Sequence, residues 1–335
     1  MTTETTLPDF ARDCVNLASP RLGTRVTFAT DEFFAPKERM LDDAPAVFIP
    51  DKYDDNGKWM DGWESRRRRN GGHDWATVKL GMAGIVRGVD IDTSHFTGNY
   101  PPAASLEGCM SETEPGADAR WVTLVPTAPL GPSAHHFIAV GHEQPVNWLR
   151  LQIYPDGGVA RLRVYGEPFK DWGTASPSET VELSALGNGG RILAYNNAHY
   201  GTVGMLLAEG RGRNMGDGWE TRRRREPGHD WIIIALGHPG TVSGIEVDTA
   251  FYRGNYPDAC SLQAARVTAG TRASIVTQSM FWPELLPHTR LEADRIHQMG
   301  AARIADLGPV SHVKLNIHPD GGVSRLRIFG RIVRE

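Results

Sequence analysis

One fifteen-residue string, crowded with side chains that can transfer protons or bind anions, occurs twice in this sequence. Residues 61–75 read Asp-Gly-Trp-Glu-Ser-Arg-Arg-Arg-Arg-Asn-Gly-Gly-His-Asp-Trp, and residues 217–231 read Asp-Gly-Trp-Glu-Thr-Arg-Arg-Arg-Arg-Glu-Pro-Gly-His-Asp-Trp. Twelve of the fifteen positions are identical, and the copies lie 156 residues apart (217 − 61). Charged residues are seldom buried without a partner, so core packing alone does not explain the duplicated string.

The carboxylate and imidazole groups of this string are the candidates for acid and base catalysis. Each copy supplies one glutamate, one histidine and one aspartate, and these are Glu64, His73, Asp74, Glu220, His229 and Asp230. Histidine exchanges a proton near neutral pH, and a carboxylate can serve as a general acid or base. The adjacent His-Asp pair could equally cap the turn before it, which is a structural role.

A run of four arginines lies in the middle of each copy, at residues 66–69 and 222–225. A planar guanidinium offers two parallel donors to a carboxylate or a ureido oxygen. If the run is extended, alternate side chains point to opposite faces, and the anion-binding candidates are Arg67, Arg69, Arg223 and Arg225. The alternatives are a solvated face with salt bridges and a nucleic-acid patch, and the net charge of −4 argues against the second.

A second matched set of polar residues follows two β-branched segments. Phe96-Thr-Gly-Asn-Tyr-Pro101 corresponds to Tyr252-Arg-Gly-Asn-Tyr-Pro257, again 156 residues apart. Loops at the rim of a rigid scaffold often carry binding residues, so the substrate-binding candidates here are Asp92, Asn99, Tyr100, Asp248, Asn255 and Tyr256. An asparagine that holds a left-handed turn is the structural alternative.

The duplication extends over most of the chain. Residues 151–166 match residues 315–330 at eleven of sixteen positions, around a shared Pro-Asp-Gly-Gly-Val. The stretch between the copies, residues 169–179, is rich in Pro, Ser and Gly, which is typical of a linker. We therefore expect a first domain at 1–168 and a second at 180–335.

The hydrophobic pattern indicates β-strands. Leu149, Leu151 and Ile153 alternate with polar residues, and Leu162 and Val164 do the same. The Pro-Asp-Gly-Gly between these runs predicts a tight hairpin. Further strands are expected at 75–80, 85–92, 231–236 and 245–248, and helical periodicity is confined to short pieces such as 291–299. The pattern predicts an all-β fold of two tandem antiparallel β-sandwiches of the jelly-roll type.

The composition excludes several classes of protein. The 335 residues are 40% hydrophobic, which is globular, and no apolar run approaches the ~18 residues that span a bilayer. The N-terminus shows no secretory signal, and three cysteines are too few for a disulfide framework, so we expect a cytoplasmic protein. Metal-ligand spacings such as His-x-His are absent, so no cofactor is required, although distant loops could still assemble a divalent metal site.

Taken together, the tandem strings, the Gly-Asn-Tyr-Pro loops and the Pro-Asp-Gly-Gly-Val segments resemble the allantoicase family over about residues 15–332. The resemblance implies a hydrolase of purine catabolism that converts allantoate and water to (S)-ureidoglycolate and urea. It also implies two jelly-roll repeats of the galactose-binding-like type and a homo-oligomer. No nucleic-acid or membrane partner is implied.

The substrate of such an enzyme carries one carboxylate and two ureido groups, and the candidate residues match these needs. The arginines would hold the carboxylate, the asparagines and tyrosines would contact the ureido groups, and the Glu, His and Asp side chains would transfer protons or orient other groups. The alternative is a non-catalytic tandem β-sandwich that binds a small anion or a sugar. The sequence does not decide which repeat carries the chemistry, or whether both share one site.

Overall fold

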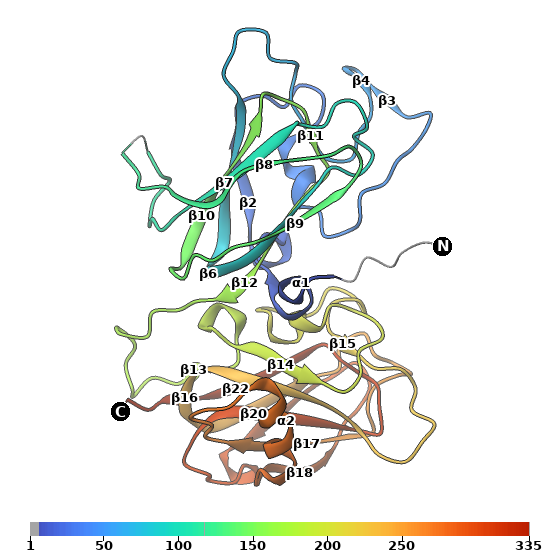
Figure 1. Cartoon of the computed structure of the whole chain (residues 1–335). Coiled ribbons are helices and arrows are strands. Elements are labelled where there is room, and N and C mark those ends of the chain that lie inside the picture. Colours follow the sequence, from blue (N-terminus) through green and yellow to red (C-terminus); the bar gives the residue numbers. More distant parts are fainter. Residues whose placement is uncertain (1–6, 117, 335) are drawn as a thin grey trace. The chain divides into compact units, whose positions relative to one another are not determined.

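The computed structural model describes residues 7–116 and 118–334, which form two compact units, Met1–Phe169 and Lys170–Glu335 (Figure 1). The division lies at the start of the expected linker. Residues 169–179 hold no helix or strand, since β12 (Arg161–Pro168) ends just before them and β13 (Val181–Glu182) begins just after. This segment is attached to unit 2, where Arg334 donates hydrogen bonds to the carbonyl oxygens of Gly173 and Ala175.

The regular secondary structure of unit 1 is mostly strands. Its helical segments are α1 (Asp9–Asp13), η1 (Pro20–Leu22) and η2 (Lys37–Leu41). Its other strands are β1 (Val15–Asn16), β2 (Arg25–Ala29), β3 (Tyr53–Asp54), β4 (Gly57–Lys58), β5 (Trp63–Glu64), β6 (Asp74–Asp92), β7 (Ala103–Cys109), β8 (Val122–Pro129), β9 (His135–Ala139), β10 (Val146–Tyr154) and β11 (Gly158–Val159).

Unit 2 repeats this order. Its helical segments are η3 (Leu186–Asn188), η4 (Val203–Leu207), α2 (Arg272–Gln278), η5 (Ser279–Phe281) and η6 (Ala301–Arg303). Its other strands are β14 (Arg191–Tyr195), β15 (Trp219–Glu220), β16 (Asp230–Asp248), β17 (Ala259–Ala265), β18 (Glu284–Arg290), β19 (Ile296–Gly300), β20 (Pro309–His318), β21 (Gly322–Val323) and β22 (Arg325–Ile332).

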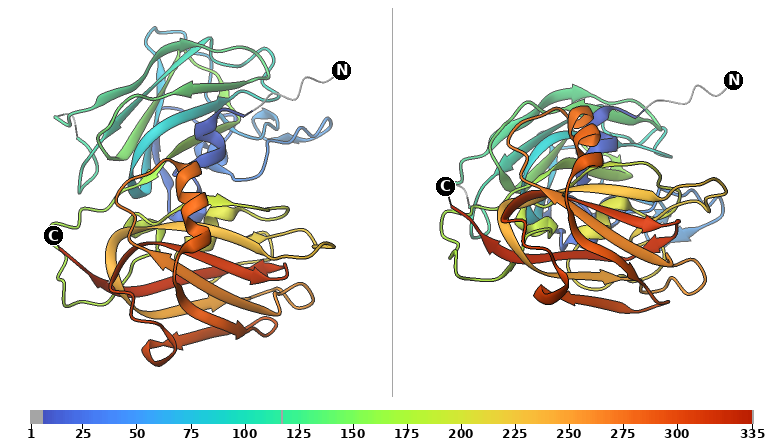
Figure 2. Two further views of the ribbon diagram at one scale, coloured as in Figure 1. Left: turned by 60° about the horizontal axis from the view of Figure 1, so that its bottom comes forward. Right: turned by 90° about the horizontal axis from the view of Figure 1, so that it is seen from below.

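The all-β fold with one antiparallel sheet assembly per repeat is confirmed. The sheet of unit 1 has the order β1-β12-β6-β10-β7-β8, and unit 2 has the matching order β13-β22-β16-β20-β17-β18. The short helix expected at 291–299 is not formed, because residues 296–300 pair with β16 as the strand β19. A helix appears instead at α2, which Figure 2 shows in orange across the strands of unit 2.

One long strand joins the two layers of each unit. The separate strands expected at 75–80 and 85–92 are one 19-residue strand, β6. Its first half pairs with β2 and β10, and its second half pairs with β9 and β12, with a register shift in between. Gly81 lies at this change, where a Cβ atom would come within 1.8 Å of the Leu22 carbonyl oxygen. Only glycine fits there, so the strand can pass from one layer to the other.

The predicted hairpin at Pro155–Gly158 is wrong. The strands on either side of it, β10 and β12, do not pair with each other, since each pairs with a different half of β6. Gly158 itself belongs to the short strand β11, which pairs with β5. The alternating pattern identified both strands correctly but could not show that the connection crosses between layers.

The interior of unit 1 is the hydrophobic face of this sandwich. Inward positions of β10 such as Leu149, Leu151 and Ile153 are fully buried, while their neighbours along the strand are not. Trp63 is also fully buried, and its indole N–H donates to the carbonyl oxygen of Asp31 at 2.8 Å. In unit 2, Trp219 repeats this contact with Asn197. The tryptophans of the repeated string are therefore core residues with a satisfied polar end.

Candidate active site

Three motifs that are far apart in the sequence meet at one place in unit 1. Gly158 N–H donates to the carbonyl oxygen of Asn99 at 2.7 Å, and Ser65 N–H donates to the carbonyl oxygen of Gly157 at 3.1 Å. A Cβ atom on Gly157 would lie 2.6–2.8 Å from the backbone of residues 99–101. The two glycines are therefore needed because the Asn99 loop packs directly on them.

Unit 2 repeats this arrangement with nearly the same distances. Gly322 N–H donates to the carbonyl oxygen of Asn255 at 2.8 Å, and Thr221 N–H donates to that of Gly321 at 3.0 Å. The repeated string, the Gly-Asn-Tyr-Pro loop and the Pro-Asp-Gly-Gly segment thus form one structural cluster in each unit.

A buried glutamate held by an asparagine lies at the centre of each cluster. Glu64 is 8% exposed, and the Asn99 amide donates to its Oε1 at 2.6 Å. In unit 2, the Asn255 amide donates to Oε1 of Glu220, which is also 8% exposed. The second oxygen of each carboxylate accepts no hydrogen bond from residues 7–116 and 118–334, and it remains accessible to solvent. Each glutamate therefore presents one open oxygen.

The electrostatic surroundings of Glu64 disfavour its charge. Burial raises the pKa of the Glu64 carboxyl, the Asn99 hydrogen bond opposes this effect, and the charge of Asp54 adds to it. Because no cation in the described part of unit 1 forms an ion pair with this carboxylate, its charge is only partly compensated.

The side chains of the arginine run alternate between paired and open. Arg66 binds Asp31 at 2.6 Å, and Arg68 binds Asp74 at 2.9 Å. Arg67 and Arg69 are exposed and form no ion pair within the described residues. The backbone of the run is also held in place, because the Asp156 carboxylate accepts a hydrogen bond from the Arg68 backbone N–H at 2.7 Å.

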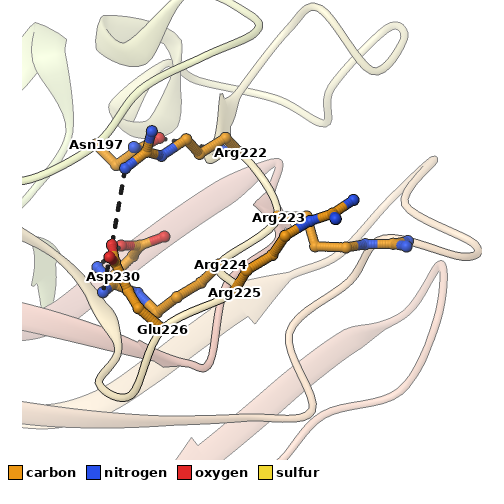
Figure 3. Close-up of a pocket in the computed structure, with 7 residues that line it drawn as sticks. All are labelled: Asn197, Arg222, Arg223, Arg224, Arg225, Glu226 and Asp230. Carbon is orange, nitrogen blue, oxygen red and sulfur yellow. Dashed lines mark hydrogen bonds and ion pairs between the residues drawn. The ribbon is translucent and has the colours of Figure 1, made fainter.

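The same alternation is visible in unit 2. Figure 3 shows Arg223 and Arg225 pointing away from the acidic side chains, while Arg224 turns toward Asp230, which it binds at 2.7 Å. The predicted anion-binding arginines are thus the ones left open, whereas the predicted catalytic residues Asp74 and Asp230 are buried partners of the intervening arginines. We assign these two aspartates a positioning role.

A hollow of about 580 Å³ opens beside the glutamate of unit 2. Its lining contains several predicted residues, namely Glu220, Arg223, Asn255 and Tyr256. It also contains polar residues that were not among the predicted site residues, which are His199, Tyr200, Thr221, Arg222, Asp258 and Asp320. Arg222 and Arg223 line both this hollow and a smaller neighbouring one, which includes Asp230. A ligand in the hollow therefore meets donors, acceptors and groups that can transfer protons.

The predicted histidines lie elsewhere, at polar positions on the sheet. His73 Nε2 lies 2.7 Å from the Gln152 side-chain oxygen, and the centroid of its ring lies 4.7 Å from that of the Tyr154 ring. His229 Nε2 lies 3.2 Å from the Asn316 side-chain oxygen, and it is not among the residues that line the hollow. The structure does not bring His229 together with Glu220.

Three histidine rings form a row in unit 2, with centroid separations of 4.8 Å (His229–His318) and 4.9 Å (His288–His318). Burial lowers the pKa of His318 from 6.5 to about 4, and the neighbouring histidines add to this effect. The folded state therefore favours the neutral ring. Its contribution to stability is fully present above pH 6.5 and is lost as the pH falls toward 4.

Replacing His318 by tyrosine, the residue at the matching position 154 of unit 1, should reduce this acid sensitivity. Both proteins should become less stable when the pH is lowered from 7 to 4.5. We expect this decrease in the free energy of unfolding to be smaller in the variant than in the parent, by about 1–2 kcal/mol after allowing for partial solvent screening. Guanidinium unfolding at both pH values measures the difference, with His142→Tyr as the control. An unchanged pH dependence would exclude His318 as the cause.

Asp92 and Asp248 end the long strands of their units, β6 and β16. Asp92 accepts the backbone N–H of Ser94 at 2.7 Å. Asp248 accepts two hydrogen bonds from Arg211, both at 3.1 Å, and a third from the Ala250 backbone. Asp248 is not among the residues that line the hollow beside Glu220, so we leave it and its counterpart Asp92 out of the proposed substrate contacts.

No three side chains of the His, Cys, Asp or Glu type lie close enough to hold a metal ion within residues 7–116 and 118–334. In the same part of the chain, no helix has the length and apolar character needed to cross a membrane. The candidate site is thus described by its amide, guanidinium, carboxylate and imidazole groups.

Comparison with known proteins gives a consistent result over both repeats. The family model "Allantoicase repeat" matches residues 15–169 and 181–333. A probable allantoicase 2 of Burkholderia pseudomallei is 59% identical, with 97% of each chain covered. A probable allantoicase of Rhizobium meliloti is 56% identical over 97% of this chain and 96% of its own.

A solved structure agrees with these sequence relatives. The crystal structure of allantoicase from Saccharomyces cerevisiae is 34% identical and superposes with a TM-score of 0.78, covering 96% of this chain and 94% of the other. The family model and the relatives thus cover both repeats. The chain belongs to the allantoicase family.

Proposed function

We propose that this protein hydrolyses allantoate to ureidoglycolate and urea, and that the reaction takes place in the hollow of unit 2. Membership of the allantoicase family supports the reaction. The observation that supports the place is the Asn255-held Glu220, which lines the hollow together with Arg222 and Arg223.

The substrate's groups have suitable counterparts in this hollow. Arg223 is open, so its guanidinium can bind the single carboxylate in a bidentate manner. The open oxygen of Glu220 can accept an N–H of a ureido group, and Tyr256 can contact the second ureido group. Fixing the substrate at three points aligns the central carbon with the catalytic groups.

Two proton transfers complete the reaction. Glu220 takes a proton from water as the water oxygen forms its bond to the central carbon, and the bond from that carbon to one ureido nitrogen breaks. A proton delivered to the departing nitrogen by His199 or Asp258 releases urea, and ureidoglycolate remains. The water molecule is thus divided between the two products, and no oxidant or reductant is consumed.

Incubating the purified chain with allantoate and quantifying urea and ureidoglycolate tests this proposal. We expect the two products in equal amounts, with turnover that a chelator does not abolish. Binding of allantoate without release of urea would instead support the alternative, a tandem β-sandwich module for small anions. Loss of activity with a chelator, restored by one divalent ion, would show that distant side chains assemble a metal site in solution.

We also propose that the protein is a cytoplasmic homo-oligomer, as the family resemblance and the composition lead us to expect. Light scattering coupled to size exclusion measures the number of copies, and a single 36.8 kDa species would contradict the oligomer. Cell fractionation tests the location.

A further inference from the structure

We propose that unit 1 contains a second ureido-acid site, which binds the substrate without hydrolysing it. This inference rests on the proposed function. It starts from Glu64, which the proposed reaction does not use. Glu64 is more than nine-tenths buried, is held by Asn99 on one side, and leaves its other oxygen open.

A buried, partly compensated carboxylate attracts hydrogen-bond donors. Burial raises the pKa of Glu64 and Asp54 raises it further, so N–H groups of a ligand would relieve an unfavourable charge. A ureido group supplies neutral N–H donors of this kind. The loop beside the carboxylate is accessible, because a Cβ atom on Gly98 would meet nothing within 4 Å.

Unit 1 also keeps the cation that would hold a carboxylate. Arg66 is neutralised by Asp31 and lies over the Phe33 ring at 5.1 Å. Arg67, the next residue, is exposed and has no ion-pair partner in the described part of the chain. It corresponds to Arg223, so the donor and acceptor that select a ureido acid are present in both units.

The groups proposed for proton delivery are missing from unit 1. Ala35 and Tyr200 occupy matching positions, because each forms a backbone hydrogen bond with the buried glutamate of its own unit. The preceding residues, Phe34 and His199, therefore match as well. The backbone N–H of Leu130 donates to the carbonyl oxygen of Pro102, and that of Leu291 donates to Asp258 in the same way, so Pro102 and Asp258 also occupy matching positions. His199, Tyr200 and Asp258 of the unit 2 hollow are thus replaced in unit 1 by Phe34, Ala35 and Pro102, which cannot transfer a proton. Unit 1 retains the binding groups and lacks the two residues proposed to protonate the leaving nitrogen.

The number of allantoate molecules bound per chain tests this inference. Turnover is first removed by His199→Ala together with Asp258→Asn, and binding is then measured by calorimetry on the full-length protein. We expect two molecules per chain. Adding Glu64→Gln and Asn99→Ala should reduce this number to one, whereas the exposed control Glu112→Gln should leave it at two.

A single molecule in the turnover-deficient protein, or two that persist after the changes at positions 64 and 99, would overturn the inference. If those changes prevent folding, hydrogen exchange in the turnover-deficient protein replaces them. Allantoate should then slow exchange in residues 96–101 as well as in 252–257, and protection of the second loop alone would contradict a site in unit 1. Urea release by the unmodified protein, measured in parallel, separates failure of this inference from failure of the proposed function.

Discussion

Replacing Glu220 by glutamine should lower kcat/KM for urea release from allantoate by about 10²–10⁴-fold, the range expected when a general base is removed. Glutamine has nearly the same shape and still offers an oxygen to the Asn255 amide. It cannot accept a proton from water at neutral pH. The loss should appear mainly in kcat, because the arginine that binds the substrate carboxylate is unchanged.

Glu284→Gln is a suitable control, since this glutamate is exposed on β18 and does not line the hollow. Its activity should stay close to that of the parent, and the circular dichroism spectra of both variants should be unchanged. A folded Glu220→Gln protein that retains more than about a tenth of the parental kcat/KM would rule out Glu220 as the base.

Replacing Asp217 by alanine should destabilise unit 2 by about 3–5 kcal/mol, the usual cost of leaving a buried charge without its partner. Arg325 is 2% exposed and binds the Asp217 carboxylate at 3.1 Å. The same guanidinium donates to the carbonyl oxygens of Asp217 and Ser324, both at 2.7 Å. Without the carboxylate, the charge would be left with neutral acceptors only.

Denaturation with guanidinium chloride measures the loss of unfolding free energy, and two further variants serve as controls. The double change Asp217→Leu with Arg325→Met removes both charges and should recover most of the stability. Asp61→Ala should act in the same direction in unit 1, where Asp61 binds the buried Arg161 at 2.8 Å. A cost below about 1 kcal/mol for Asp217→Ala would place this pair among ordinary surface ion pairs.

The structural role of Asp217 also shows why the residues of the repeated string could not be assigned to packing or to chemistry from the sequence alone. Asp61, Trp63 and Asp74 are as constant between the copies as Glu64, yet they hold the fold together. Asp61 binds an arginine 100 residues away, and Trp63 fills the core. Residues kept for packing and residues kept for chemistry have the same appearance until their distant partners are known.

Several strands could be predicted, because period-two alternation is a local property, although part of β19 fell within the segment expected to be helical. Their pairing could not, as the failed hairpin at Pro155–Gly158 shows: β10 and β12 are neighbours in the chain but pair with different halves of β6. The prediction of separate strands failed for a related reason. Strands were expected at 75–80 and 85–92, whereas Gly81 allows one strand to continue past Leu22.

The glutamate, asparagine and open arginines of the site were found from the sequence because both repeats keep them. His199, Tyr200 and Asp258 were missed because the first repeat replaces them. One signal was available, since Tyr-Pro-Pro at residues 100–102 becomes Tyr-Pro-Asp at 256–258 within otherwise matching loops. Differences between the repeats therefore support the proposed placement of catalysis in unit 2, while identities indicate what the two units share.

The position of allantoate in crystals of the Glu220→Gln protein tests most directly whether the hollow of unit 2 is the active site. We expect substrate density in that hollow, with the carboxylate against Arg223 and a ureido nitrogen within hydrogen-bond distance of residue 220 and Asn255. An empty hollow in unit 2, with allantoate bound instead beside His229 or Asp248, would contradict it.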